Sequence, residues 1–226
     1  MAAGGVLRSL SQLFFPETCA GCAEKLTTSE QYICADCLSS LAILSPEDRL
    51  AEYKGKYEAD KLIDAIYPLF GMMKDSIEIE IIHHIKYRNK QRMAVFLGRR
   101  HAEEIIDYYD CDILTPVPLH KLKKLERGYN QSELFSAGIS ELSGITVVNA
   151  LTKIKYTETQ THKSGFERRK NIYNTFILTE GVSVEGKSVL LVDDVLTTGS
   201  TVSECARVLR EHGAAKVAVA TLALTL

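Results

Sequence analysis

Apolar residues recur through the middle of the chain in the pattern of amphipathic helices. Between about Ile77 and Tyr109 they follow near-helical spacing among charged residues. This pattern predicts two helices that are interrupted near Asn89. A shorter amphipathic helix is expected within residues 6–15, immediately ahead of Pro16.

The second half of the chain alternates short apolar runs with helical patterns, and Gly144 and Gly213 are placed to end two helices. The expected strands are Cys111–Val117, Ile145–Val148, Thr175–Leu178, Ser188–Val192 and Lys216–Leu224, and the expected helices are Ser132–Leu142 and Val202–His212. Parallel strands need crossover connections, so strands that alternate with helices favour a parallel sheet. The expected fold class is therefore α/β, a parallel sheet flanked by helices.

The pattern divides the chain into three parts. Residues 1–45 are expected to hold the N-terminal helix and a small cysteine-rich module, residues 46–110 a helical connecting region, and residues 111–226 the α/β core. The first boundary is set where a polar connection begins at Pro46. A length of 226 residues suits one substantial domain with a small appendage.

Composition and charge narrow the class of protein. With 46% hydrophobic residues, 25% charged residues and a net charge of -2, the chain resembles an ordinary soluble globular protein, without the basic excess of a nucleic-acid binder. Polar residues interrupt the apolar stretch within residues 6–15, which argues against a signal peptide. No apolar run approaches the roughly 18 residues of a membrane span. We expect a cytoplasmic protein without a membrane partner.

The most informative segment follows the apolar run Val189–Val192. Asp193 and Asp194 come directly after it, at the edge where parallel α/β sheets bind ligands. Buried carboxylates there need a partner such as ribose hydroxyls or a magnesium ion. The alternative interpretation is a plain strand-turn-helix connection with solvated aspartates.

The turn that follows is rich in small hydroxyl residues around Gly199, where backbone amides can approach an anion closely. The next helix would complete a phosphate site with its N-terminal amides, and Thr201 with Glu204 is expected to form a capping box. No lysine follows Gly199, so the segment is not a nucleotide P-loop. A sugar phosphate fits better than a triphosphate.

This string is similar to the motif by which phosphoribosyltransferases bind phosphoribosyl pyrophosphate (PRPP). The resemblance implies that Asp193 and Asp194 are the catalytic carboxylates facing the ribose 2′- and 3′-hydroxyls, and that PRPP is bound with Mg²⁺. It also implies that the amides and hydroxyls from Thr197 to Thr201 hold the 5′-phosphate. The substrate-binding residues of this motif are Val195, Leu196, Thr197, Thr198, Gly199, Ser200 and Thr201.

A basic segment runs from Pro116 to Gln131, and its cations, Lys124 among them, suit a pyrophosphate group. It resembles an element of the ComF family of phosphoribosyltransferase-like proteins, sometimes described as amidophosphoribosyltransferase-like. The resemblance implies Arg127, Asn130 and Gln131 as site residues. A solvated basic loop before a helix is the alternative.

A second ComF-like element lies between two expected strands. Its candidate substrate-binding residues are Gln160, Lys163, Arg168 and Asn171. Lys163 departs from the family, which often has an apolar residue there. In phosphoribosyltransferases a flexible loop closes over the substrate and excludes water, and a charged surface loop is the alternative. Ile85-Lys86-Tyr87 also resembles a Leu-Lys-Tyr element of the family.

Four cysteines form two Cys-x-x-Cys pairs, Cys19 with Cys22 and Cys34 with Cys37. Four thiolates satisfy tetrahedral zinc and leave no open position, so a closed structural Zn²⁺ site is expected. An iron-sulfur cluster and a redox dithiol pair are the alternatives. The zinc interpretation agrees with the N-terminal zinc ribbon of the ComF family. The two remaining cysteines are far apart and are expected to be buried thiols.

Two functions remain open. The first is transfer of a phosphoribosyl group from PRPP to a nitrogen acceptor. The second is a non-catalytic protein that senses PRPP or a nucleotide, or that docks a partner of the DNA-uptake machinery, because the ComF family is associated with natural competence. Direct binding of single-stranded DNA by the cysteine module is disfavoured, since Lys25 is the only lysine or arginine within residues 19–37.

Overall fold

The computed structural model describes residues 17–87, 90–156 and 173–226. The N-terminal helix expected within residues 6–15 lies outside this range. The described helices are α2 (Ala35–Ser39), α3 (Pro46–Lys56), α4 (Ile77–Tyr87), α5 (Arg92–Tyr108), α6 (Lys121–Arg127), α7 (Gln131–Ser143) and α9 (Ser200–Glu211). The strands are β1 (Ala65–Met72), β2 (Ile113–Pro116), β3 (Leu151–Lys153), β4 (Phe176–Leu178), β5 (Ser188–Leu196) and β6 (Lys216–Thr225).

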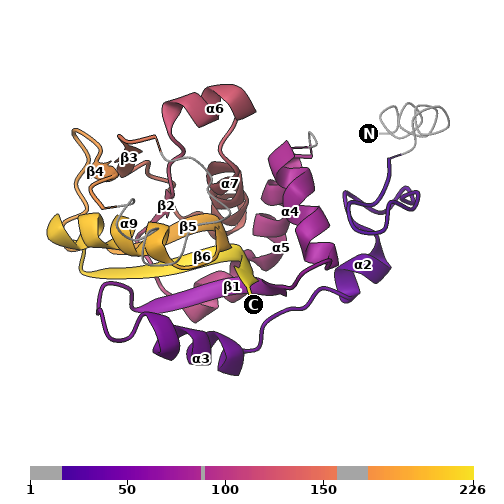
Figure 1. Ribbon diagram of the computed structural model, residues 1–226, viewed down its shortest axis with the longest axis horizontal. Helices are drawn as coiled ribbons and strands as arrows, with labels where there is room; N and C mark the ends of the chain where they lie inside the picture. Colours follow the sequence, from indigo (N-terminus) through magenta and orange to yellow (C-terminus); the bar gives the residue numbers. More distant parts are fainter. Residues whose placement is uncertain (1–16, 88–89, 157–172) are drawn as a thin grey trace.

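A four-stranded sheet forms the centre of the molecule, with the strand order β1-β6-β5-β2 (Figure 1). All three pairs of neighbouring strands are parallel. The α/β class and the parallel sheet predicted from the sequence are therefore confirmed.

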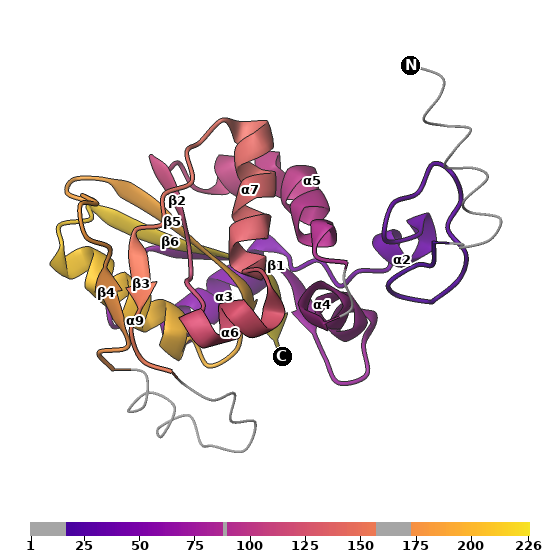
Figure 2. The same cartoon turned by 90° about the horizontal axis from the view of Figure 1, so that it is seen from above.

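Helices cover both faces of the sheet, as Figure 2 shows from above. Alternate residues of β5 point to opposite faces: Leu190 and Val192 belong to the apolar core beneath α5 and α7, whereas Val189 and Leu191 belong to the core beneath α3 and α9. Each face of the strand is fully buried. The continuous apolar run that ends at Asp193 is thus explained by helices on both sides.

Strand β1 is a correction to the sequence analysis, which placed no strand within residues 46–110. It pairs with β6 at the edge of the sheet. Pro68 and Gly71 lie inside it, and both residue types are depleted in strands, although an edge strand tolerates them. The region 46–110 is thus not purely helical, and its separation from the core as a folding unit stays a prediction.

The polar connection beginning at Pro46 is in fact helix α3. Ser45 and Asp48 form a reciprocal capping box, and Pro46 occupies the first turn. The basic segment likewise contains a helix, α6, which ends at Gly128 in the left-handed conformation. Both helices carry cap residues that the sequence displays but that the apolar pattern alone does not reveal.

The helices expected between Ile77 and Tyr109 are confirmed as α4 and α5. Two of the expected strands differ from the structure. The run at 145–148 forms a single bridge, Val147 to Leu114, rather than a strand. The run at 175–178 forms β4, which pairs with β3 in a separate antiparallel sheet.

The cysteine-rich module lies to one side of the molecule, beyond α4 (Figure 1). Its chain makes antiparallel bridges at Thr18–Lys25 and Gln31–Ile33 and then enters α2. Cys111 and Cys205 are buried free thiols, as expected. Among the described residues, no helix combines the length and apolar character needed to cross a membrane.

Candidate ribose-phosphate site

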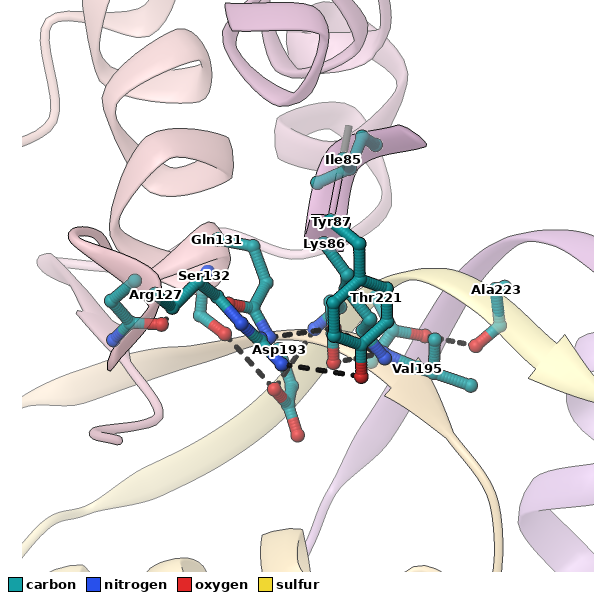
Figure 3. A network of polar contacts seen from close by, with 12 residues as sticks. Ile85, Lys86, Tyr87, Arg127, Gln131, Ser132, Asp193, Val195, Thr221 and Ala223 are labelled. Carbon is teal, nitrogen blue, oxygen red and sulfur yellow. Dashed lines mark hydrogen bonds and ion pairs between the residues drawn. The ribbon is translucent and has the colours of Figure 1, made fainter. Parts of the chain in front are cut away.

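Two aspartates at the carboxyl end of β5 form the centre of the candidate site. Figure 3 shows Lys86 from the end of α4 and Gln131 and Ser132 from the start of α7 converging on this strand end. Three segments that are far apart in the sequence therefore meet at Asp193 and Asp194.

Asp194 is buried and is held by two side chains. The Lys86 ammonium lies 2.7 Å from its Oδ2, and the Gln131 side-chain amide donates to the same oxygen at 2.9 Å. Burial alone would raise the pKa of Asp194, but the charge and hydrogen bond of Lys86 and the Gln131 hydrogen bond hold it below its ordinary value. Asp194 is therefore a carboxylate at neutral pH.

Asp193 has a different environment. The Ser132 hydroxyl and the Asp194 backbone amide donate to its Oδ1, each at 2.9 Å. Burial and the neighbouring charge of Asp194 raise the pKa of Asp193 to about 7. Two adjacent aspartates with pKa values pushed apart are a feature of sites that perform chemistry or bind charged ligands.

The turn after β5 leads directly into α9 through Gly199, whose φ of 74° is the left-handed conformation. No side chain caps the N-terminus of α9. The hydroxyls of Thr198 and Ser200 lie 3.0 Å apart within this turn. Free amides, a helix dipole and two hydroxyls together make a site suited to a phosphate group.

The capping box expected between Thr201 and Glu204 is wrong. Glu204 instead accepts a hydrogen bond from the backbone amide of Asn174 at 2.7 Å and pairs with Arg207 at 2.7 Å. Glu204, which the sequence pattern assigns to the cap of α9, is instead bound by residues that the pattern does not include. The consequence is that the N-terminus of α9 keeps its amides for another ligand.

The predicted cations of the basic segment are paired with other residues in the structure. The Lys124 ammonium lies 2.7 Å from a carboxylate oxygen of Glu133. The Arg127 guanidinium lies 5.1 Å from the centre of the Tyr87 ring. The pyrophosphate role of both residues stays a prediction, and binding of an anion by Lys124 would compete with Glu133.

Asn130 and Gln131 make different contacts, although they are neighbours in the sequence. Asn130 caps α7 by accepting from the Ser132 amide, and its side-chain amide donates to the Val117 carbonyl at 2.9 Å. It therefore fixes the start of α7 against the end of β2. Gln131 reaches Asp194 directly. The candidates Gln160, Lys163, Arg168 and Asn171 lie outside the described residues.

Three residues at the site were not among the sequence candidates. Lys86 carried one signal, its place in the Leu-Lys-Tyr-like element. Ser132 has no sequence signal of its own and is marked only by its position next to Gln131. Lys153, on β3, lies 5.4 Å from the Phe176 ring, and burial and the charge of Lys123 lower its pKa. The negative charge of Asp193 acts in the opposite direction and raises the pKa of Lys153.

The four cysteines of the N-terminal module form a separate cluster. Their sulfur atoms all lie within 4.8 Å of one another, and the sulfurs of Cys22 and Cys34 are 3.8 Å apart. Zinc–sulfur bonds of about 2.3 Å in a tetrahedron require sulfurs at about this separation. The amides of Gly21 and Cys34 each donate to the sulfur of Cys19 at 3.3 Å. The donor set and its geometry fit a four-coordinate metal ion.

Comparison with protein families agrees with this geometry. The model of the phosphoribosyl transferase domain matches residues 133–225, which contain β5, the turn at Gly199 and α9. The match thus includes the aspartates and the uncapped helix.

Relatives are found in several bacteria. The chain is 35% identical over 153 residues to the DNA utilization protein YhgH of Escherichia coli K12, covering 65% of this chain and 66% of that protein. It is 34% identical over 151 residues to competence protein F of Haemophilus influenzae, covering 63% and 66%. Competence protein ComFC of Bacillus subtilis is 25% identical over 217 residues, covering 91% and 83%. The matched segment spans just under two thirds of the length of the first two relatives.

Among solved structures, glutamine PRPP amidotransferase from B. subtilis is similar to 62% of this chain, with 26% sequence identity and a TM-score of 0.44. The match covers 30% of that longer chain.

Proposed function

The chain belongs to the ComF family of phosphoribosyltransferase-like proteins, and from this premise we propose that it binds PRPP or a closely related ribose phosphate with magnesium. Asp193 and Asp194 accept hydrogen bonds from the ribose hydroxyls, and the N-terminus of α9 holds the 5′-phosphate. The observation that carries this proposal is the position of the partly buried Asp193 and the buried Asp194, which differ in ionisation, one turn ahead of a helix N-terminus that no side chain caps.

Magnesium fits the donor set at Asp193. Among the described residues, hydrogen bonds reach Oδ1 of this carboxylate, and its other oxygen is left for a ligand. Carboxylate and phosphate oxygens are the ligands that magnesium prefers. The ion, when bound, would neutralise the charge of the pyrophosphate group.

The reaction we propose is transfer of the phosphoribosyl group to a nitrogen acceptor. The C1′–oxygen bond breaks, pyrophosphate leaves with the bonding electrons, and the acceptor nitrogen uses its lone pair to form the new bond to C1′ and gives up its proton to the departing pyrophosphate or to water. The protein contributes position and charge: Lys86 keeps Asp194 ionised and Gln131 orients it. The alternative is a non-catalytic sensor that uses the same site without turnover.

The test is calorimetric titration of magnesium-PRPP into the wild type and into the Asp193→Asn, Asp194→Asn double variant, which keeps the side-chain shapes. Two exposed aspartates, Asp75 and Asp107, provide a matched control when both are changed to asparagine. We expect saturable binding that is lost only in the site variant. Absence of binding to folded wild type would refute the proposal. Pyrophosphate release with a panel of nitrogen acceptors then separates an enzyme from a sensor.

A second candidate function is binding of a nucleic-acid strand beside the cysteine module. A cavity of about 940 Å³ lies there, and the exposed Arg92, Arg99 and Arg100 of α5 line it, with Arg99 paired to Glu141 of the same lining at 3.3 Å. Tyr32 and Phe96 form an aromatic pair in the same wall, with ring centres 5.8 Å apart. Cations beside aromatic rings suit a phosphodiester chain with stacking bases. This groove supplies the positive charge that residues 19–37 lack, and the relatives' names concern DNA utilization and competence.

Fluorescence anisotropy with a single-stranded oligonucleotide tests this second function. We expect Arg99→Gln with Arg100→Gln to weaken binding and to reduce its salt dependence. Lys54→Gln with Lys216→Gln, two exposed lysines on α3 and β6 that line neither this cavity nor the one at the phosphate turn, removes the same charge and should have no effect. Equal binding by both double variants would exclude the groove.

The cysteine cluster is proposed to hold one structural zinc ion. The fit of four sulfurs to a tetrahedron supports zinc over a redox role, because all four thiols converge on one point rather than on two separate pairs. The ion would order the short turns at residues 19–37.

A further inference from the structure

Tyr57 lies against the phosphate turn although it belongs to a distant part of the chain. It is the residue that caps the end of α3, and its side chain is only 3% exposed. A methyl group placed on Gly199 would lie 2.2 Å from the Tyr57 hydroxyl oxygen. The hydroxyl is therefore in direct contact with the residue that precedes α9.

The Tyr57 hydroxyl is a buried polar group without a hydrogen-bond partner among the described residues. Leaving such a group unpaired destabilises the folded state, so native proteins rarely retain one without a reason. Burial raises the pKa of Tyr57 above its ordinary value. The group is thus protonated at neutral pH and able to donate a hydrogen bond.

A cavity of about 570 Å³ lies against both the Tyr57 side chain and the phosphate turn. Tyr57 lines it together with Thr197, Thr198 and Ser200. The first amides of α9, which no side chain caps, belong to the same turn. The residues that carry these unsatisfied donors, Tyr57 after α3 and the first turn of α9, therefore line the same cavity.

The cations of the cavity are already engaged. Lys56 forms an ion pair with Glu52, and Arg207 pairs with Glu204 and Glu211. A ligand at this end of α9 is therefore recognised by neutral donors and by the helix dipole rather than by free cations. The occupant that accepts several hydrogen bonds from such donors is a tetrahedral phosphate group.

We propose that the Tyr57 hydroxyl donates a hydrogen bond to the phosphate group bound at the N-terminus of α9. Tyr57 is then a phosphate-binding residue supplied from outside the sequence motif. This inference rests on the proposed function and adds a specific ligand contact to it. It also gives a reason, besides the left-handed backbone, for glycine at position 199, because any side chain there would displace the Tyr57 hydroxyl.

The test compares Tyr57→Phe with Tyr53→Phe, a matched removal of one hydroxyl from the same helix. Inorganic phosphate and magnesium-PRPP are titrated separately into each protein, with the ³¹P chemical shift of bound phosphate as a second readout. We expect Tyr57→Phe to weaken both ligands by about 5–10-fold, the effect of one hydrogen bond, and to change the ³¹P shift. Tyr53→Phe should bind as the wild type does.

The thermal unfolding midpoint of unliganded Tyr57→Phe should match or exceed that of the wild type, because an unpaired hydroxyl is removed while the ring stays. Wild-type affinity in Tyr57→Phe would overturn the inference and leave the proposed function intact. Lack of any phosphate or PRPP binding by the wild type would overturn both. A loss of affinity that accompanies an equal loss of folding stability would assign Tyr57 a structural role and so contradict the inference.

Discussion

Asp193 changes its protonation state close to neutral pH, because burial and Asp194 raise its pKa to about 7. The folded state therefore binds this proton more tightly than the unfolded chain does. The resulting stabilisation is fully present below about pH 4 and is lost as the pH rises toward 7. Ionised Asp193 thus costs folding stability at the pH where it can accept hydrogen bonds from a ribose.

We expect Asp193→Asn to be more stable than the wild type at pH 8, by about 1–3 kcal/mol, and to lose this advantage near pH 4. The asparagine oxygen can still accept from Ser132. Urea unfolding at the two pH values measures the difference. A pH-independent difference would show that the pKa of Asp193 is not raised in the folded protein.

Lys86 and Asp194 form an ion pair in which each side chain neutralises the charge of the other. Lys86→Met should cost about 3–5 kcal/mol of unfolding free energy, because it leaves a buried carboxylate without its cation. Adding Asp194→Asn should recover much of this loss. Chemical unfolding of the two single variants and the double variant gives the coupling free energy between Lys86 and Asp194. Strictly additive changes in unfolding free energy would argue against their ion pair.

At the scale of elements, helices α5 and α7 approach so closely that glycine is required on both. A methyl group on Gly98 would lie 2.5 Å from the Phe135 carbonyl oxygen, and one on Gly138 would lie 2.2 Å from that of Val95. This close packing fixes α7, whose first residues hold the aspartates. The geometry of the site thus depends on a helix contact at some distance from it.

Gly138→Ala should therefore destabilise the protein by more than about 2 kcal/mol and weaken ligand binding as α7 shifts. Gly55→Ala is the matched control, because Gly55 lies inside α3 and nothing comes within 4 Å of an added methyl group. That variant should be more stable by about 0.5–1 kcal/mol. Thermal and chemical unfolding distinguish the two, and a neutral Gly138→Ala would contradict the close packing.

The sequence predicted those elements whose apolar pattern is strong and local. Strand β5 and helices α4, α5 and α9 follow from their periodicity, and Asp193 and Asp194 from their place after a buried strand. Strand β1 could not be found in this way, because Pro68 and Gly71 weaken its local signal and its stability comes from pairing with distant β6.

The same limit applies to the site. A local motif can identify the aspartates, but Lys86 and Tyr57 reach the site through tertiary packing that no spacing in the sequence encodes. The predicted capping box was wrong for the same reason, since Glu204 accepts a hydrogen bond from Asn174 on another segment.

At the scale of the whole molecule, the cysteine module packs against the core beneath α5 and α7, to which it adds only a few buried apolar residues. The rest of its order is expected to come from a metal ion held by the four sulfurs. Protein purified without chelators should contain about one zinc ion per chain, and less than about half would argue against the site. Chelation should unfold the module at a lower temperature than the core, which differential scanning calorimetry would resolve, while magnesium-PRPP binding persists.

The strand order has a consequence for how the protein is made. Strand β6 lies inside the sheet between β1 and β5, yet it is the last of the four along the chain. During synthesis, β1 emerges before its neighbour in the sheet, β6, and the edge that pairs with β6 stays unpaired until more than a hundred further residues have been added. The nascent chain must therefore protect an apolar strand from incorrect pairing over this interval, and the sheet that carries the candidate site closes only when β6 inserts between β1 and β5.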